Sequence, residues 1–396
     1  MPSTGPRQMY RMSFTVPFTH RVVFTRDVLG GDSDALLDVL EADEKARVMF
    51  VVDNGLIDDG GVLLGKVDAL AERFGTRVEV VGETVRVTAG EDSKNDPAAV
   101  EQLLAAIHDR GLDRRSYIVV IGGGAVLDTV GFAAAIAHRG IRLVRLPSTT
   151  LGQADSGIGV KNAVNLHGKK NWQGTFAVPW AVINDEALLA TLPDRDFRCG
   201  FSEAVKVALL KDADEFDRLC TDASAIAERE PAACYRAIER SAFLHLMHIT
   251  RGGDPFEMRE ARPLDFGHWS AHRLEPMTGF ALRHGEAVAI GVALDCFYST
   301  LTQGFPEADT LRVVRCLEAL RLPLTHPALA RTDELLDGLE EFRQHLGGRL
   351  TITLLGGIGR PVDVHEIDPA AMAEAIAALR EHADAKAAAR VIGDAA

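Results

Sequence analysis

The chain contains three short segments that together offer the ligands of a metal ion. Glu203 lies in the first, His268 and His272 share the second, and His284 begins the third. Each segment is apolar and helix-prone, and His268 and His272, four residues apart, would share one helix face. A single histidine is more often a satisfied core residue than a ligand. One carboxylate and two imidazoles in such segments nevertheless match a catalytic zinc site with one position left open.

Three consecutive glycines, Gly122-Gly123-Gly124, stand between a buried strand pattern and a helix pattern. Such a turn lets backbone N–H groups approach a pyrophosphate at a helix N-terminus, which indicates a dinucleotide site. A tight turn without a ligand is the alternative, because the spacing is not GxGxxG. Asp53 ends another strand pattern and suits either a ribose hydroxyl or a helix cap. A metal and a nicotinamide together would serve a redox step on a hydroxylated substrate.

A polar stretch, which we expect to form a loop, follows the strand pattern that ends at Pro147. Its hydroxyl, amide and charged side chains are Ser148, Thr149, Thr150, Asp155, Lys161, Asn165, Lys169, Lys170 and Asn171. In an acidic chain these groups favour a site for a substrate phosphate and hydroxyls, although a solvated basic loop is the alternative. Lys206 would share a helix face with Glu203, either as a surface ion pair or, given its apolar neighbours, in a buried segment.

Two differently built halves must position these residues. The first half alternates strand and helix patterns, which predicts a Rossmann-like parallel α/β sheet. Its strands are expected at 48–53, 78–81, 117–121 and 143–147, with helices at 61–74, 96–110 and from the glycines to 138. Helices dominate the second half, at 201–220, 231–250, 266–276, 284–302, 308–320 and 368–390, beside an extended piece at 351–355. We therefore predict a tail at 1–13, an NAD-binding α/β domain at 14–193 and a mostly helical metal- and substrate-binding domain at 194–396, with the active site between the two domains.

The composition narrows the possible partners. The 396 residues carry a net charge of −14, which argues against nucleic acid or an anionic membrane surface as a partner. Five cysteines without a CxxC pair indicate buried thiols in a reducing cytoplasm. We expect neither a signal peptide nor a membrane span, because the first residues are polar and no apolar run is long enough.

Taken in order, the motifs resemble those of the 3-dehydroquinate synthase-like sugar phosphate cyclases. The resemblance runs from about Val48 to Gly359. The segments that carry it are 90–94, 122–128, 139–140, 147–155, 159–161, 170–171, 191–195, 203–206, 266–268 and 284–286. Several separated motifs in the right order form a far more specific signal than any one of them.

The resemblance implies a metal site, a cofactor site and a substrate site. Glu203, His268 and His284 match the ligands of zinc, with Co²⁺ as an alternative ion. The positions that match the NAD site are Asp53, Glu91, Lys94, Gly123, Gly124, Asp128, Ser148, Thr149, Lys170, Thr191 and Leu192. The positions that match substrate contacts are Asp155, Lys161, Asn171, Lys206 and His272. Arg139 matches an arginine that reaches the phosphate in the partner's site, which implies a homodimer, and Arg360 falls where a phosphate-binding lysine often stands.

The activity that the resemblance implies is that of a phosphate-eliminating lyase. NAD oxidises a substrate hydroxyl transiently, phosphate leaves, the hydride returns to the same carbon, and an intramolecular aldol step closes a carbocycle. NAD is therefore catalytic and is not consumed, and the enzyme mainly orients these steps and stabilises developing oxyanions.

Departures from the family pattern bear on the substrate. Dehydroquinate synthases usually have Asn where this chain has Asp265, and a carboxylate there would repel a carboxylated substrate. Leu246 and Ala261 stand where those enzymes have basic residues, although Arg259 and Arg262 are nearby. These features favour a neutral ketose phosphate such as sedoheptulose 7-phosphate, from which a C7 cyclitol would be made.

His272 separates this chain from some seven-carbon cyclases. The 2-epi-5-epi-valiolone and desmethyl-4-deoxygadusol types typically have Pro in that region, so His272 favours the 2-epi-valiolone synthase-like branch. Three alternatives stay open: a 3-dehydroquinate synthase, a metal-dependent alcohol or glycerol dehydrogenase, and a non-catalytic binding protein. The set of Lys161, Lys170, Asn171 and Lys206, which only a phosphorylated substrate needs, disfavours the dehydrogenase, and the intact ligand set disfavours the binding protein.

Overall fold

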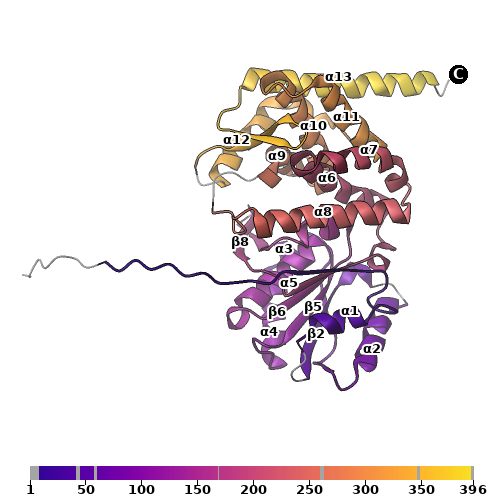
Figure 1. Ribbon diagram of the computed structural model, residues 1–396, viewed down its shortest axis with the longest axis vertical. Helices are drawn as coiled ribbons and strands as arrows, with labels where there is room; N and C mark the ends of the chain where they lie inside the picture. Colours follow the sequence, from indigo (N-terminus) through magenta and orange to yellow (C-terminus); the bar gives the residue numbers. More distant parts are fainter. Residues whose placement is uncertain are drawn as a thin grey trace, which may run out of the picture.

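The computed structural model describes residues 9–41, 45–57, 60–167, 169–258, 263–345 and 348–393. A sheet flanked by helices forms one half of the molecule, drawn in indigo to magenta, and a group of helices forms the other half, drawn mostly in orange and yellow (Figure 1). This is the predicted fold class, an α/β domain followed by a mostly helical domain.

The main sheet of the first domain is parallel throughout, in the order β1-β9-β6-β5-β2-β3, with β4 also paired to β2. Its strands are β1 (Arg21–Thr25), β2 (Ala46–Asp53), β3 (Val78–Val80), β4 (Val85–Val87), β5 (Tyr117–Gly122), β6 (Arg142–Pro147) and β9 (Ala181–Asp185). The helices between them are α1 (Asp34–Val39), α2 (Val62–Phe74), α3 (Asp92–Asn95), α4 (Pro97–Asp109) and α5 (Gly124–Ile136).

Both faces of this sheet are covered, which explains why its strands read as continuous apolar runs. Phe50 and Val119 pack with α1 and α2 on one face, whereas Val51 and Val120 pack with α4 and α5 on the other. Because all strands run the same way, the polar residues that follow β2, β5 and β6 gather at one edge of the sheet, where ligands of such sheets bind.

The second domain is built around α10 (His284–Thr302), which is almost entirely buried. The helices around it are α6 (Asp194–Lys211), α7 (Ala213–Ala227), α8 (Pro231–Arg251), α9 (His268–Met277), α11 (Glu307–Ala319), α12 (Thr332–His345) and α13 (Pro369–Gly393), beside the hairpin β10 (Ile352–Gly357)–β11 (Arg360–Val364). One apolar cluster joins residues of α6, α9, α10, α11 and α13, so the ends of α9 and α10 are held by a common core.

Two predicted elements were wrong. The helix expected at 201–220 is two helices, α6 and α7, because Asp212 leaves the helical conformation and its side chain caps α7 by accepting the N–H of Glu215. The polar stretch after Pro147 is not a loop throughout. It contains the antiparallel hairpin of β7 (Lys161–Leu166) and β8 (Lys169–Phe176), whose second strand is exposed and so lacks the apolar alternation of a half-buried strand.

Several elements were not predicted at all. The strands β1 and β9, the short strands β4 and β11, and α12 have no counterpart among the expected segments. Residues 1–8 of the predicted tail lie outside the described residues, and residues 9–20 form neither helix nor strand. The domain boundary at 193/194 stays a prediction, although α6 begins at Asp194. No helix in the described ranges is long and apolar enough to cross a membrane.

Candidate active site

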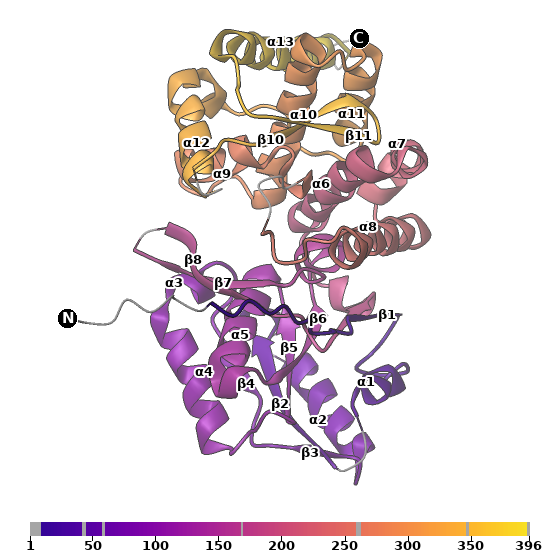
Figure 2. The same cartoon turned by 60° about the vertical axis from the view of Figure 1, so that its left-hand side comes forward.

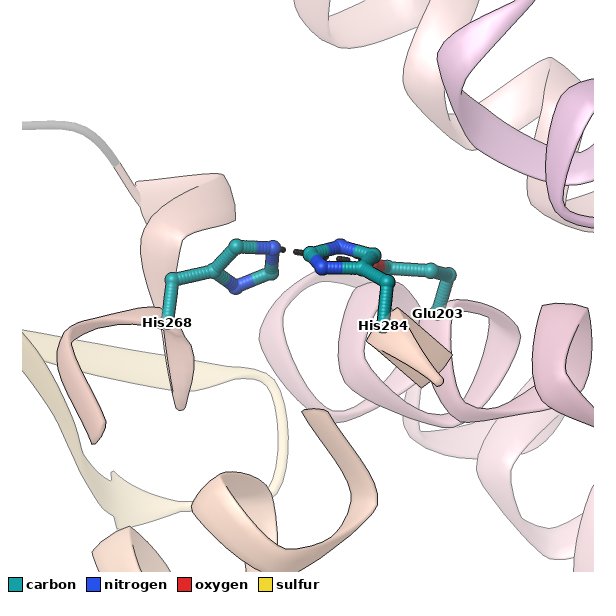
Figure 3. Close-up of side chains that lie close together, drawn as sticks. All are labelled: Glu203, His268 and His284. Carbon is teal, nitrogen blue, oxygen red and sulfur yellow. Dashed lines mark ion pairs between the residues drawn. The ribbon is translucent and has the colours of Figure 1, made fainter. Parts of the chain in front are cut away.

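The three proposed metal ligands come from three helices of the second domain and point toward one another (Figure 3). Glu203 lies within α6, whereas His268 and His284 are the first residues of α9 and α10. Glu203 Oε1 is 3.5 Å from His268 Nε2 and 3.4 Å from His284 Nε2. The three ligand atoms all lie within 4.8 Å of one another.

These separations fit a tetrahedral metal ion. Ligands at about 2.1 Å from zinc would stand about 3.4 Å apart along a tetrahedral edge. Glu203 Oε1 is buried and has no partner with hydrogen-bond geometry among the described residues. Burial would lower the pKa of His284, but the neighbouring carboxylates of Glu203 and Glu275 raise it to about 10. The carboxylates thus favour a positive charge at this point, which a divalent cation would supply.

Hydrogen bonds on the far side of each imidazole orient the two histidines. His268 Nδ1 lies 3.1 Å from the carbonyl oxygen of Phe266, and His284 Nδ1 lies 3.4 Å from Glu275 Oε2. In both cases the outer contact leaves Nε2 facing Glu203, as expected of metal-binding histidines. Glu275 was missed by the sequence analysis. It lies seven residues after His268 on the same face of α9, and this spacing was the signal that could have revealed it.

A second group of possible ligands consists of His272, Glu275 and His284. Glu275 is already engaged there, because its Oε1 accepts a hydrogen bond from Lys170 Nζ at 2.9 Å while its Oε2 faces His284. The set around Glu203, whose Oε1 has no such partner, is therefore the better metal site.

Lys206 forms a buried pair with Glu203, with 2.5 Å between Nζ and Oε2. Burial would lower the pKa of Lys206, but Glu203 and Asp155 outweigh it and raise that pKa above its usual value. Burial would likewise raise the pKa of Glu203, yet the positive charges of Lys206 and His268 hold it well below its usual value. The predicted i,i+3 pair is therefore an internal ion pair and not a surface one.

The other residues of the proposed substrate site surround this pair. Asp155, on the turn Gly152–Ser156, lies 2.7 Å from His245 Nδ1 on α8, and its charge acts on Lys206. Asp265 lies just before α9, and its charge acts on both Lys206 and His272. The ring centroid of His272 is 5.3 Å from that of His268. The structure thus brings four predicted residues together and adds His245, which the sequence analysis missed because its spacing links it to none of the other site residues.

The glycine turn and Asp53 meet at the carboxyl edge of the sheet. Asp53 Oδ1 accepts the N–H of Gly55 at 2.8 Å, so the residue does act as a cap. Burial raises the pKa of Asp53, although backbone N–H groups, including that of Gly123, oppose the shift. A Cβ at Gly123 would stand 3.2 Å from the side chain of Thr149, and one at Gly124 would stand 2.9 Å from Ser156 Oγ. The close approach explains why glycines occupy this turn at the N-terminus of α5.

A polar chain links this turn to the hairpin β7–β8. Lys94 is buried, and its Nζ donates to Asp128 Oδ2 at 2.8 Å and to Asn171 Oδ1. Asn165 Nδ2 donates to Glu91 Oε1 at 2.9 Å. Of the residues proposed for NAD, Glu91, Lys94 and Asp128 therefore share one network with the hairpin. Ser148 joins the same edge, since its N–H donates to the carbonyl of Gly122 at 2.9 Å.

The remaining predicted residues lie farther out. Lys161 is exposed and paired with Glu257, and Arg139 is exposed at the end of the short helix that follows α5. Thr191 and Leu192 precede α6, where the carbonyl of Leu192 accepts a hydrogen bond from Arg229. Arg360 begins β11, beside Gly359, whose N–H donates to Leu209 of α6 at 2.7 Å. The roles proposed for these residues stay predictions.

Of the positions compared with the basic residues of dehydroquinate synthases, the structure describes only Leu246. Leu246 packs beside the apolar cluster of Ile158, Val182 and Ala242. Ala261, Arg259 and Arg262 lie outside the described residues.

Comparisons with known proteins agree with this architecture. The family model for the 3-dehydroquinate synthase N-terminal domain matches residues 84–199, and the model for the C-terminal domain matches residues 200–341. A 3-dehydroquinate synthase of Xylella fastidiosa (strain M12) is 37% identical over 298 residues, which are 73% of this chain and 79% of that protein. A 2-epi-5-epi-valiolone synthase of Streptomyces glaucescens is 34% identical over 302 residues, which are 76% of this chain and 77% of that protein.

A solved structure has the same fold. ValA, the 2-epi-5-epi-valiolone synthase from Streptomyces hygroscopicus subsp. jinggangensis 5008 with NAD⁺ and Zn²⁺ bound, has a TM-score of 0.84 and 29% identity. The match covers 94% of this chain and 100% of that one. The resemblance inferred from the motifs is confirmed: the chain belongs to the 3-dehydroquinate synthase family and is a sugar phosphate cyclase, a lyase that acts on phosphates.

Proposed function

We propose that this enzyme converts sedoheptulose 7-phosphate, a ketose phosphate without a carboxylate, into a C7 cyclitol with release of phosphate. NAD would lie on the α/β domain, and zinc or cobalt(II) would be held by Glu203, His268 and His284. When bound, the metal acidifies a substrate hydroxyl and NAD accepts and returns its hydride. The structural neighbour ValA, crystallised with NAD⁺ and Zn²⁺, supports this cofactor pair.

The residues around the metal ligands would bind and orient the sugar. Lys206 stays cationic because two carboxylates raise its pKa, so it can stabilise an oxyanion beside the metal position. Asp155 is held by His245 and can accept a hydrogen bond from a substrate hydroxyl. Lys161, Asn171 and Arg360 would bind the remaining hydroxyls and the phosphate, and Arg139 would reach the phosphate of the partner's site in a cytoplasmic homodimer.

The position of Asp265 is the observation on which the proposed substrate rests. Its negative charge acts on Lys206 and on His272, so its carboxylate lies within electrostatic range of the proposed substrate groups. A carboxylate is an acceptor only, and it suits a hydroxyl far better than a second carboxylate. A neutral polyol therefore fits this part of the site better than a sugar acid.

A 3-dehydroquinate synthase activity is the second candidate. It is favoured by the 37% identity to the enzyme of Xylella fastidiosa. Its substrate carries a carboxylate, which Asp265 would repel, so the two candidates predict opposite substrate preferences.

The deciding experiment uses the purified protein with NAD and a divalent metal. Phosphate release would be followed beside the NADH absorbance band, once with sedoheptulose 7-phosphate and once with the carboxylated precursor of dehydroquinate. Phosphate from the neutral sugar without accumulation of NADH supports the proposal. Phosphate only from the acid sugar refutes it, and net NADH formation would point to a dehydrogenase.

The variant Asp265→Asn tests the residue itself. It should relax the discrimination against the carboxylated sugar, because the repelling charge is gone. An unchanged preference would remove Asp265 from the argument.

A further inference from the structure

A chain of charged contacts crosses from the first domain to the proposed metal site. Lys170 Nζ on β8 lies 2.9 Å from Glu275 Oε1 on α9. Glu275 Oε2 lies 3.4 Å from His284 Nδ1, and His284 Nε2 lies 3.4 Å from Glu203 Oε1. Figure 2 shows the hairpin β7–β8 on the side of its domain that faces α9.

We propose that Glu275 is a positioning residue for the metal ligand His284, and that Lys170 ties this residue to the NAD-binding domain, so that metal and NAD each strengthen the binding of the other. The inference rests on the proposed metal and NAD sites, and it adds a link between them.

Glu275 is suited to hold His284. It is only 4% exposed, so its carboxylate has little freedom to move. Its Oε1 accepts a hydrogen bond from Lys170 Nζ at 2.9 Å, so a cationic partner holds one oxygen while Oε2 faces His284. By accepting the Nδ1 proton it fixes the tautomer in which Nε2 is free to bind a metal.

The two proposed histidine ligands differ in what holds them. His268 is oriented by a backbone carbonyl, that of Phe266, which no side-chain change removes. His284 depends on the side chain of Glu275 and, through it, on Lys170. Lys170 also supplies the positive charge that a buried carboxylate needs. A change on the hairpin can therefore reach one metal ligand and spare the other.

Neighbouring residues on β8 connect the same strand to the proposed cofactor site. Asn171, next to Lys170, accepts a hydrogen bond from Lys94, which also binds Asp128 on α5. Lys170 Nζ also lies 3.8 Å from Glu91 Oε1, so the lysine that contacts Glu275 is close to the same network. Occupancy by NAD would steady the hairpin, and the steadied hairpin would hold Glu275. Because such coupling is reciprocal, metal would strengthen NAD binding by the same factor.

The test measures zinc affinity by competition with a chelator, with and without NAD, on the full-length protein. The variants are Glu275→Gln, Lys170→Met and the double variant. Matched controls are Glu215→Gln, a buried glutamate on α7 paired with Arg218, and Lys66→Met, a lysine paired with Asp27. Melting temperatures of the metal-free proteins report on folding.

The proposal makes specific demands. NAD should tighten zinc binding to the unaltered protein by at least about fivefold. Glu275→Gln should weaken zinc binding by about 10- to 100-fold. Lys170→Met alone should weaken zinc binding several-fold. Added to Glu275→Gln, it should weaken zinc binding by less than a further twofold, because the two residues act through one contact. Both variants should lose the effect of NAD, and the controls should keep it.

Each contrary outcome has a separate meaning. Zinc affinity of Glu275→Gln within twofold of the unaltered protein would overturn the positioning role. A normal zinc response to NAD in Lys170→Met would overturn the link between the sites. If the unaltered protein binds neither zinc nor NAD, the proposed function itself fails, and this result is distinguishable from both others.

Discussion

Substitution of Gly291 by alanine should damage the metal site from a distance, although Gly291 holds no ligand. Gly291 lies in α10, two turns after His284, and faces the turn of Gly267. A Cβ at position 291 would stand 2.0 Å from the carbonyl oxygen of Gly267 and 2.8 Å from Ser270 Oγ. An ordinary contact begins at 3.4 Å, so the Gly267 carbonyl or α10 must move by the difference, about 1.4 Å.

This displacement is large for a metal site. His268 directly follows Gly267, and metal–ligand distances tolerate only about 0.2 Å. Overpacking of a core of this kind costs about 1–3 kcal/mol in the free energy of unfolding. We therefore expect Gly291→Ala to lower the stability of the metal-free protein by that amount. We also expect zinc affinity to fall by about tenfold or more, the loss usual for a disturbed ligand orientation.

The assay combines urea unfolding of the metal-free protein with zinc competition. Gly65→Ala is the matched control, because Gly65 is also inside a helix, α2, and a Cβ there meets nothing within 4 Å. This control should be more stable by about 0.4–1 kcal/mol, with unchanged zinc affinity. If Gly291→Ala matches the unaltered protein in stability and binds zinc within twofold, the packing of α10 against the Gly267 turn does not position His268, and the reasoning is refuted.

Three further outcomes are expected. Glu203→Ala and His268→Ala should each lose zinc and activity, while the exposed control His108→Ala should keep both. Normal zinc content in both ligand variants would contradict the ligand assignment. Arg139→Ala should raise the KM for the sugar phosphate while sedimentation still shows the proposed dimer, and an unchanged KM would remove Arg139 from the proposed phosphate site. Burial raises the pKa of Asp295 to about 7 from 3.8 against its hydrogen bonds. Between these two pKa values the folded protein holds a proton that the unfolded chain releases. The resulting contribution to the free energy of unfolding is fully present below about pH 3.8 and is lost as the pH rises through 7. The full shift is worth about 4 kcal/mol, of which about 2.6 kcal/mol is lost between pH 5 and pH 8. Urea unfolding at these two pH values should show that fall, Asp295→Asn should lack it, and parallel profiles would contradict the assignment.

The sequence revealed the inner strands of the sheet because they are buried on both faces. Strands such as 48–53 and 117–121 form apolar runs that stand out from their surroundings. The edge strand β1 pairs with β9, so that Arg21 lies beside Ala181 in the sheet although the two residues are far apart in the sequence. No local pattern signals such a pairing, since the partner that buries the strand is distant in sequence.

The break between α6 and α7 was hidden for a different reason. The apolar spacing continues from Leu210 to Phe216, so periodicity alone predicts one helix. Asp212 ends α6 and caps α7, and a single capping residue inside an apolar pattern has little weight in such a reading. The hairpin β7–β8 was not predicted because its second strand is exposed on both sides and therefore lacks alternating apolar residues.

The candidate site could be predicted where rare residue types carry it. Two histidines four residues apart, a third before Gly-Glu and a glutamate in an apolar helix are uncommon enough to suggest a metal site. His245 could not be singled out, because a histidine at that position looks like an ordinary helix residue, and Glu275 was marked only by its spacing of seven residues from His268. Their roles come from contacts that join different elements, α9 with α10 and α8 with the turn at Asp155.

Charge balance explains why one residue, Asp265, can decide between two related substrates. Four carboxylates meet around the proposed metal position, those of Asp155, Glu203, Asp265 and Glu275, against the two lysines Lys170 and Lys206. A divalent cation would make this set neutral when the histidines are uncharged. The hydroxyl groups of a ketose then leave the balance intact, whereas a substrate carboxylate would add a negative charge without a partner in the same group, which is unfavourable when the charge is taken from water. An asparagine in place of Asp265 leaves one positive charge to receive that carboxylate. The same substitution replaces one acceptor oxygen by a donor, so it should weaken the contact to a sugar hydroxyl and admit the acidic sugar.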